Sequence, residues 1–204
     1  MKHYGDITKL SGYDLPVVDI ITGGSPCQDL SVANGNRTGL DGERSGLFME
    51  QIRIVREMRE RDKADGRADE YIRPRYMVWE NVPGAFNSNK GRDFQTVLTE
   101  IVRIVQPEAP DVPLPSDGKW SYSGCIYDDM GRWSIAWRLH DAQFWGVPQR
   151  RKRIALVADF AGLSAPEVLF VRKGLQWDSG KSGAQGQGSA GDTEEGSGEP
   201  SEPG

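Results

Sequence analysis

A cysteine, a glutamate and a group of arginines are the residues of this chain best able to do chemistry. Cys27 follows a proline just beyond an apolar run, Glu80 ends a second apolar run, and a basic run covers residues 149–153. A thiolate is a strong nucleophile, and nearby cations lower the pKa of a thiol enough to form one near neutral pH. A carboxylate at the end of an apolar strand needs polar partners if it is buried. Together these groups indicate a site that combines a nucleophile, a carboxyl group and guanidinium groups.

Each of these features also has a purely structural explanation when it is taken alone. A single cysteine is most often a small buried hydrophobe. A strand-end glutamate can turn to solvent, and a basic run can be a solvated turn. An unrelated cysteine hydrolase is a weak alternative, because neither His3 nor His140 lies beside a matching motif. The features gain weight only if the fold brings them to one place.

The predicted strands would do so. Short β-branched or apolar runs that end at glycine, proline or polar residues predict four strands: residues 15–24, 75–82, 134–142 and 153–160. The first should be a buried parallel strand. In a parallel sheet, ligands bind beyond the carboxyl ends of the strands. Cys27 and Glu80 should both lie at that edge, and the basic run should open the last strand.

Two amphipathic helices are expected between these strands. Apolar residues at helical spacing predict one helix over residues 46–61 and another over residues 93–105. Strands that alternate with helices predict an α/β fold with a mainly parallel sheet and flanking helices.

In its order of motifs the chain resembles the DNA cytosine-5 methyltransferase family. The resemblance covers roughly residues 3 to 160, and four motifs in the family's order are far more specific than a Pro-Cys pair alone. The motifs are Gly5-Asp6-Ile7, Gly24-Ser25-Pro26-Cys27-Gln28, Glu80-Asn81-Val82, and Gln149, Arg151 and Arg153 in the pattern Q-x-R-x-R. The resemblance implies a partial Rossmann-like S-adenosylmethionine-dependent methyltransferase fold.

The resemblance also implies the catalytic roles. Cys27 would add to carbon 6 of a cytosine flipped out of double-stranded DNA, which makes carbon 5 reactive toward a methyl group. Glu80 would contact N3 and the exocyclic amine of the base, and Arg153 would reach O2. Arg151 and Arg153 could supply the positive surroundings that the thiolate needs.

Further residues are implied to bind the cofactor and the DNA. For S-adenosylmethionine, Asp6 would accept from the adenine amine, Ile7 would lie against its ring, and Pro26 and Leu47 would line the pocket. For DNA, Ser31 would contact the backbone, and the implied DNA-binding set is completed by Gln28, Asn81 and Gln149. Taken alone, Asp6 is an ordinary turn residue, Leu47 an ordinary helix-core residue and Ser31 an ordinary loop serine.

The chain also departs from the family pattern. The glycine-rich turn that precedes the Gly-Asp-Ile motif in the family, and the target-recognition domain that follows the last motif, have no counterpart here. We therefore expect residues 1–173 to be a portion of a catalytic domain, which a complementing methyltransferase chain could complete. The alternative is an inactive remnant that at most binds DNA weakly.

Composition agrees with a cytoplasmic protein without a membrane span. The net charge is -5, and residues 174–204 carry six acidic side chains and one basic one, so the rest of the chain is neutral. That segment is rich in Gly, Ser and Glu, which predicts a disordered tail. Two cysteines, Cys27 and Cys125, do not make a disulfide framework or a zinc site.

Overall fold

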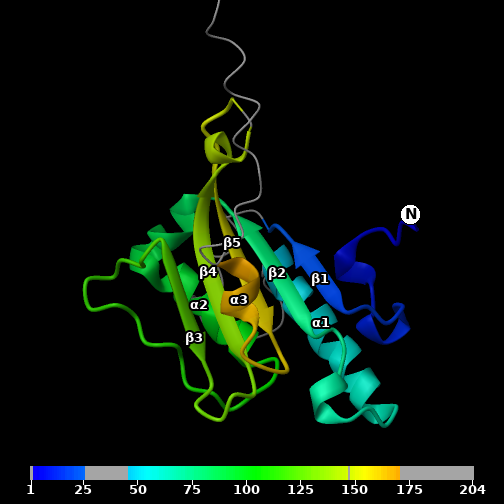
Figure 1. The fold of residues 1–204 in the computed structure, drawn as a ribbon. Coiled ribbons are helices and arrows are strands. Elements are labelled where there is room, and N and C mark those ends of the chain that lie inside the picture. Colours follow the sequence, from blue (N-terminus) through cyan, green and yellow to red (C-terminus); the bar gives the residue numbers. More distant parts are fainter. Residues whose placement is uncertain (1, 26–45, 147, 171–204) are drawn as a thin grey trace, which may run out of the picture. The chain divides into compact units, whose positions relative to one another are not determined.

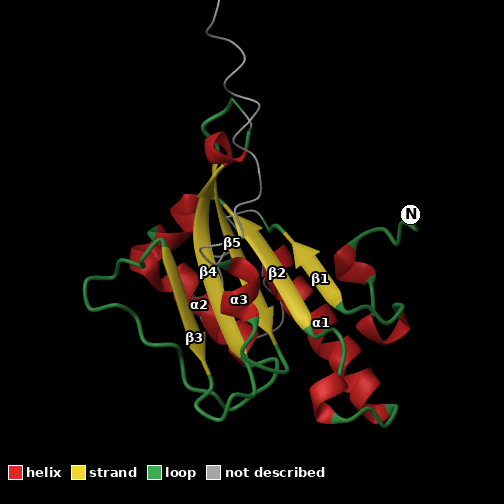
Figure 2. Cartoon of the chain, viewed as in Figure 1, coloured by secondary structure: helices red, strands yellow, loops and turns green. Residues whose placement is uncertain are grey.

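A computed structural model describes residues 2–25, 46–146 and 148–170 of the chain. In these ranges five strands and three α-helices form an α/β unit (Figures 1 and 2). In chain order they are β1 (Ile20–Gly23), α1 (Leu47–Ala64), β2 (Tyr76–Asn81), α2 (Arg92–Val102), β3 (Ser123–Tyr127), β4 (Ser134–Asp141), β5 (Lys152–Asp159) and α3 (Ala165–Leu169). None of the helices in the described ranges is long and apolar enough to span a membrane.

The α/β class is confirmed, but the expectation of a mainly parallel sheet is wrong. The strand order is β1-β2-β5-β4-β3, and only β1 and β2 pair in parallel. The pairs β2–β5, β5–β4 and β4–β3 are antiparallel. The connections explain this result. A parallel pair needs a crossover of a dozen or more residues, such as α1 between β1 and β2, whereas residues 128–133 and 142–151 are short enough for hairpins.

The first predicted strand is shorter and less buried than its apolar sequence suggests. Strand β1 begins at Ile20 rather than at residue 15, and its side chains alternate between exposed and half-buried. Ile20 is 55% exposed. The predicted parallel pairing of this strand is confirmed. The prediction that the strand is buried is wrong, because within the described ranges β1 pairs only with β2 and so lies at the edge of the sheet.

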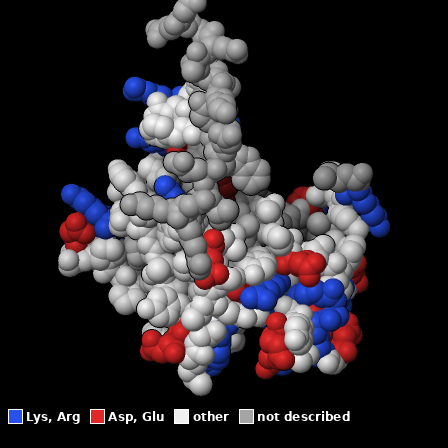
Figure 3. Space-filling view, viewed as in Figure 1, with Lys and Arg blue, Asp and Glu red and all other residues white. Residues whose placement is uncertain are grey.

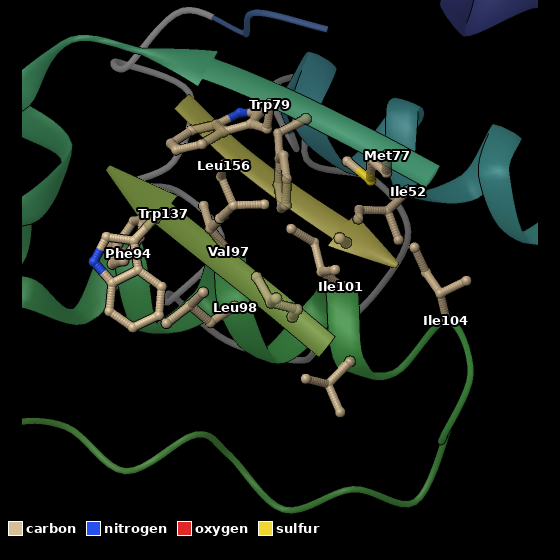
Figure 4. Close-up of a cluster of buried hydrophobic side chains, with 14 of the residues drawn as sticks. Ile52, Met77, Trp79, Phe94, Val97, Leu98, Ile101, Ile104, Trp137 and Leu156 are labelled. Carbon is tan, nitrogen blue, oxygen red and sulfur yellow. The ribbon is translucent and has the colours of Figure 1, made fainter. Parts of the chain in front are cut away.

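Helices cover both faces of the sheet, and the main core lies on one of them. Helices α1 and α2 pack on one face, and α3 packs on the other (Figure 1). Figure 4 shows α2 side chains meeting those of β2, β4 and β5 in the main core. Most of the apolar positions expected to face this core are buried: Phe48, Ile52, Val55 and Met58 in α1, and Phe94, Val97, Leu98 and Ile101 in α2. Val105, expected on the same face of the second helix, lies beyond the end of α2 and is half-buried.

The predicted tail lies outside the described residues. The expected boundary at residue 173 and the whole of 174–204 fall there. The division into a catalytic portion and a tail therefore stays a prediction.

Candidate functional site

The end of β2 and the start of β5 meet at one edge of the sheet. Because the two strands are antiparallel, Glu80 lies opposite Ala155, and Asn81 lies opposite Ile154. Arg153 directly precedes Ile154 on β5, and its Nε lies 2.7 Å from Oε1 of Glu80. Two of the predicted catalytic residues are thus in direct contact.

This ion pair is accessible to solvent. The side chains of Arg153 and Glu80 are 33% and 50% exposed. An exposed pair contributes only about 0.2–1 kcal/mol to stability. The pair therefore contributes little to the stability of the fold. Both groups remain accessible to a ligand.

The end of β1 reaches the same edge and passes very close to Glu80. A Cβ atom on Gly24 would lie 3.0 Å from Oε2 of Glu80, so a larger residue there would displace the carboxylate or the backbone. Gly24, which has no side chain, thus lets the main chain approach the carboxyl group.

Ser25, the last described residue before Cys27, is fixed from β2. The indole Nε1 of Trp79 donates to Oγ of Ser25 over 3.1 Å, and the amide Nδ2 of Asn81 donates to its carbonyl oxygen over 2.9 Å. Asn81 is 4% exposed, and its Oδ1 accepts from the backbone N–H of Val82. Both ends of the Asn81 amide therefore bond within the protein, an arrangement that favours a role in orienting Ser25. Direct contact of Asn81 with DNA stays a prediction.

Several predicted residues fall outside the described ranges. Pro26, Cys27, Gln28 and Ser31 belong to residues 26–45. Their proposed roles therefore remain predictions that rest on the sequence.

The rest of the basic run lies on the connection between β4 and β5. Gln149 and Arg151 are exposed there, and the backbone N–H of Ala142 donates to the carbonyl oxygen of Arg151 over 3.0 Å. Figure 3 shows basic side chains on this connection at the top of the view, whereas acidic and basic side chains are mixed around the lower end of α1. The connection thus presents positive charge above the Glu80 edge.

The predicted cofactor residues that the structure describes lie where the N-terminal segment meets α1. Asp6 caps a short 3-10 helix, η1 (Ile7–Lys9), and its Oδ1 accepts from the backbone N–H and the hydroxyl of Thr8. The bond from the backbone N–H of Thr8 is the main cause that lowers the pKa of Asp6. Leu47 begins α1 and is 43% exposed. A carboxyl acceptor and an exposed apolar side chain fit a nucleoside ligand.

Arg53 fastens this segment to α1, a role that sequence analysis did not predict. Its guanidinium forms ion pairs with Glu50 and Glu57 of the same helix. It also donates to the carbonyl oxygens of Ile7 over 3.1 Å and Leu10 over 2.8 Å. These bonds link residues 43 and 46 positions apart, so no local pattern reveals them. Arg53 therefore holds the segment that contains the Gly-Asp-Ile motif against α1.

Replacing Arg53 by Met should loosen the N-terminal segment. Loss of charge-assisted bonds to two carbonyl oxygens should lower the free energy of unfolding by about 2 kcal/mol. The amide hydrogen of Gly12, which donates to Glu57, should exchange faster with solvent. Hydrogen exchange measures this directly. Arg103→Met, which breaks ion pairs to Glu100 and Asp111, is the control and should leave Gly12 protected. Unchanged exchange at Gly12 in Arg53→Met would contradict this role.

One buried amide near these residues lacks a hydrogen-bond partner. Gln51, in α1, is 5% exposed, and its Nε2 has no partner within the described part of the chain. Among the same residues there is no group of three or more His, Cys, Asp or Glu side chains placed to hold a metal ion.

The comparisons with known proteins identify the family. The model of the C-5 cytosine-specific DNA methylase family matches residues 1–104, about half of the chain. The chain therefore belongs to the C-5 cytosine-specific DNA methylase family.

Individual relatives are longer than this chain. It is 33% identical over 197 residues to a DNA N-6-adenine-methyltransferase of Escherichia phage P1, which covers 86% of this chain and 25% of the relative. It is 29% identical to the type II methyltransferase M.AquIA of Picosynechococcus, over 71% of this chain and 45% of the relative. A crystal structure of the Dnmt2 methyltransferase of S. pombe matches with a TM-score of 0.44 and 17% identity, over 78% of this chain and 36% of that one. The chain thus spans less than half of the length of each.

Proposed function

We propose that this chain carries the catalytic groups of a DNA cytosine-5 methyltransferase, with Cys27 as the nucleophile. The observation that supports this most is the contact between Glu80 and Arg153 beside Gly24, at the edge where the chain leads toward Cys27. Ser25 is fixed at that edge, and two residues of chain span at most about 7 Å. Cys27 follows Ser25 by two positions in the sequence, which supports its assignment to this edge.

The chemistry explains why these groups belong together. Carbon 5 of cytosine is a poor nucleophile, so the thiolate of Cys27 first forms a bond to carbon 6, and the ring electrons move toward N3 and O2. Carbon 5 would then bond to the methyl group of S-adenosylmethionine as the bond from that methyl group to sulfur breaks, leaving the neutral thioether S-adenosylhomocysteine. Water would take the proton from carbon 5, which would expel the thiolate and restore the ring. The base must leave the duplex for this reaction, which costs a few kcal/mol of stacking.

Glu80 and Arg153 would stabilise the charge that develops on the ring. The carboxyl group of Glu80 would contact N3 and the exocyclic amine, and Arg153 would both hold that carboxyl group and reach O2. A free thiol has a pKa of about 8.5 and is mostly protonated at neutral pH. The positive charges of Arg151 and Arg153 would lower the pKa of Cys27 and so favour its thiolate.

Asp6, Ile7, Pro26 and Leu47 would hold S-adenosylmethionine, with Arg53 fixing Ile7 against α1. The exposed side chain of Leu47 and the position of Asp6 as the N-cap of η1, directly before Ile7, support this assignment. Double-stranded DNA would be the substrate, contacted by Gln28, Ser31 and Gln149. A second polypeptide could supply the glycine-rich turn and the target-recognition domain.

Analysis of the methylated nucleoside tests this function. The chain is incubated with duplex DNA and methyl-labelled S-adenosylmethionine, alone and with a polypeptide that carries the two family segments named above. The DNA is then digested to nucleosides. We expect label in 5-methylcytosine, most strongly in the complemented reaction. Label in N6-methyladenine would contradict the proposal, as would a lack of label with all chains shown to be folded. The latter result would support an inactive remnant.

A further inference from the structure

Gln51 is a polar residue at a buried position of α1, where an apolar residue is usual. It lies in α1 between Phe48 and Ile52, which are both 1% exposed, and it is itself 5% exposed. Its Nε2 has no hydrogen-bond partner in the described ranges. A buried amide without a partner costs roughly 1–3 kcal/mol. A hydrogen bond to a bound ligand would offset this cost.

The amide of Gln51 packs directly on the end of β1. A Cβ atom on Gly23 would lie 2.4 Å from Oε1 and 2.7 Å from Nε2 of Gln51, so a larger residue there would displace the amide from this position. The next residue, Gly24, faces Glu80 instead. Successive residues of a strand point to opposite faces of the sheet. Gln51 and Glu80 therefore lie on opposite sides of the same short stretch of main chain.

This arrangement assigns Gln51 to the cofactor side of the site. It follows Leu47 by four residues in α1, and side chains at that spacing lie on one face of a helix. Helix α1 also carries Arg53, which holds Ile7 in place. Among the described residues, the side chains proposed to contact S-adenosylmethionine thus belong to α1 or to the segment that Arg53 holds against it, whereas Glu80 lies on the side proposed for the base.

We propose that Gln51 binds S-adenosylmethionine, with its side-chain amide donating a hydrogen bond to an acceptor atom of the cofactor. The inference rests on the proposed function and adds a residue that the family resemblance did not supply. The donor, which has no partner in the described ranges, would gain one when the cofactor binds. The loss of this bond should therefore weaken binding without lowering the stability of the free protein.

Replacing Gln51 by Leu tests the inference, because Leu keeps a similar volume and removes the donor. Calorimetric titration of the full chain with S-adenosylmethionine should show binding that is about 2- to 13-fold weaker than in the wild type, the effect of one neutral hydrogen bond. The melting temperature of the free protein should stay the same or rise. Gln51→Glu, which replaces the donor by an acceptor, should bind at least as weakly as Gln51→Leu.

Gln95→Leu is the matched control. The amide Nε2 of Gln95 in α2 donates to the carbonyl oxygen of Val112 over 2.7 Å. Loss of this hydrogen bond in Gln95→Leu should lower the melting temperature and leave the affinity for S-adenosylmethionine unchanged.

The outcomes separate the inference from the proposed function. Wild-type affinity in Gln51→Leu would overturn the role of Gln51 alone. A fall in melting temperature like that of Gln95→Leu would show that the amide has a structural partner, and would also overturn it. If the folded wild-type chain shows no binding, the cofactor assignment itself fails, and the inference fails with it.

Discussion

Cys27→Ser should form no covalent complex with duplex DNA that contains 5-fluorocytosine. A serine hydroxyl is not ionised near neutral pH, whereas a thiol in positive surroundings is in part a thiolate. In the wild type, fluorine at carbon 5 cannot leave as a proton does, so the adduct that forms with S-adenosylmethionine persists through denaturation. We expect a band of reduced mobility in a denaturing gel for the wild type and its complete loss in the variant.

Cys125→Ser is the control for this experiment. Cys125 lies in β3 at the opposite end of the strand order and is exposed. The variant should form the complex as the wild type does. An adduct that survives in Cys27→Ser and disappears in Cys125→Ser would refute the assignment of the nucleophile.

Glu80→Gln should slow formation of the same complex by about 100-fold or more. Removal of one group that stabilises developing charge in a transition state typically lowers rates by about 10²–10³. The variant keeps the size of the side chain but loses its charge and its ion pair with Arg153. That pair is exposed, so the free energy of unfolding should change by less than about 1 kcal/mol.

Rate and stability are measured on the same preparations by single-turnover trapping and urea denaturation. Glu100→Gln, which weakens an ion pair with Arg103 in α2, is the matched control and should trap at the normal rate. A wild-type rate in Glu80→Gln would remove the carboxyl group from the mechanism.

The family resemblance implied that Glu80 and Arg153 act on the same base, but the mainly parallel sheet predicted from the sequence would have separated them. In a parallel sheet the start of the last strand would lie at the opposite edge from the end of β2. Arg153 reaches Glu80 only because β5 runs antiparallel to β2. The direction of β5 follows from its connections through β3 and β4, and β3 was not predicted because its short sequence, with Gly124 inside it, carries little strand signal.

The sequence was most informative where burial sets a period. The apolar stripes of α1 and α2 identified both helices and their core faces. It was least informative for Arg53, whose partners lie more than 40 residues away. Gln51 did leave a signal, because it occupies the stripe position three residues after Phe48. A polar residue at such a position marks either a buried hydrogen bond or a ligand contact.

Exchange of the hydrogen at carbon 5 of cytosine tests the central claim most directly. Addition of a thiolate to carbon 6 allows solvent to protonate carbon 5, so tritium at that carbon is released when the adduct reverts, without any methyl transfer. We predict tritium release from duplex DNA labelled at carbon 5 of cytosine by the wild-type chain in the absence of S-adenosylmethionine, and none by Cys27→Ser. Absence of release by folded wild-type protein that binds the DNA would contradict the claim that Cys27, Glu80 and Arg153 act together on one cytosine.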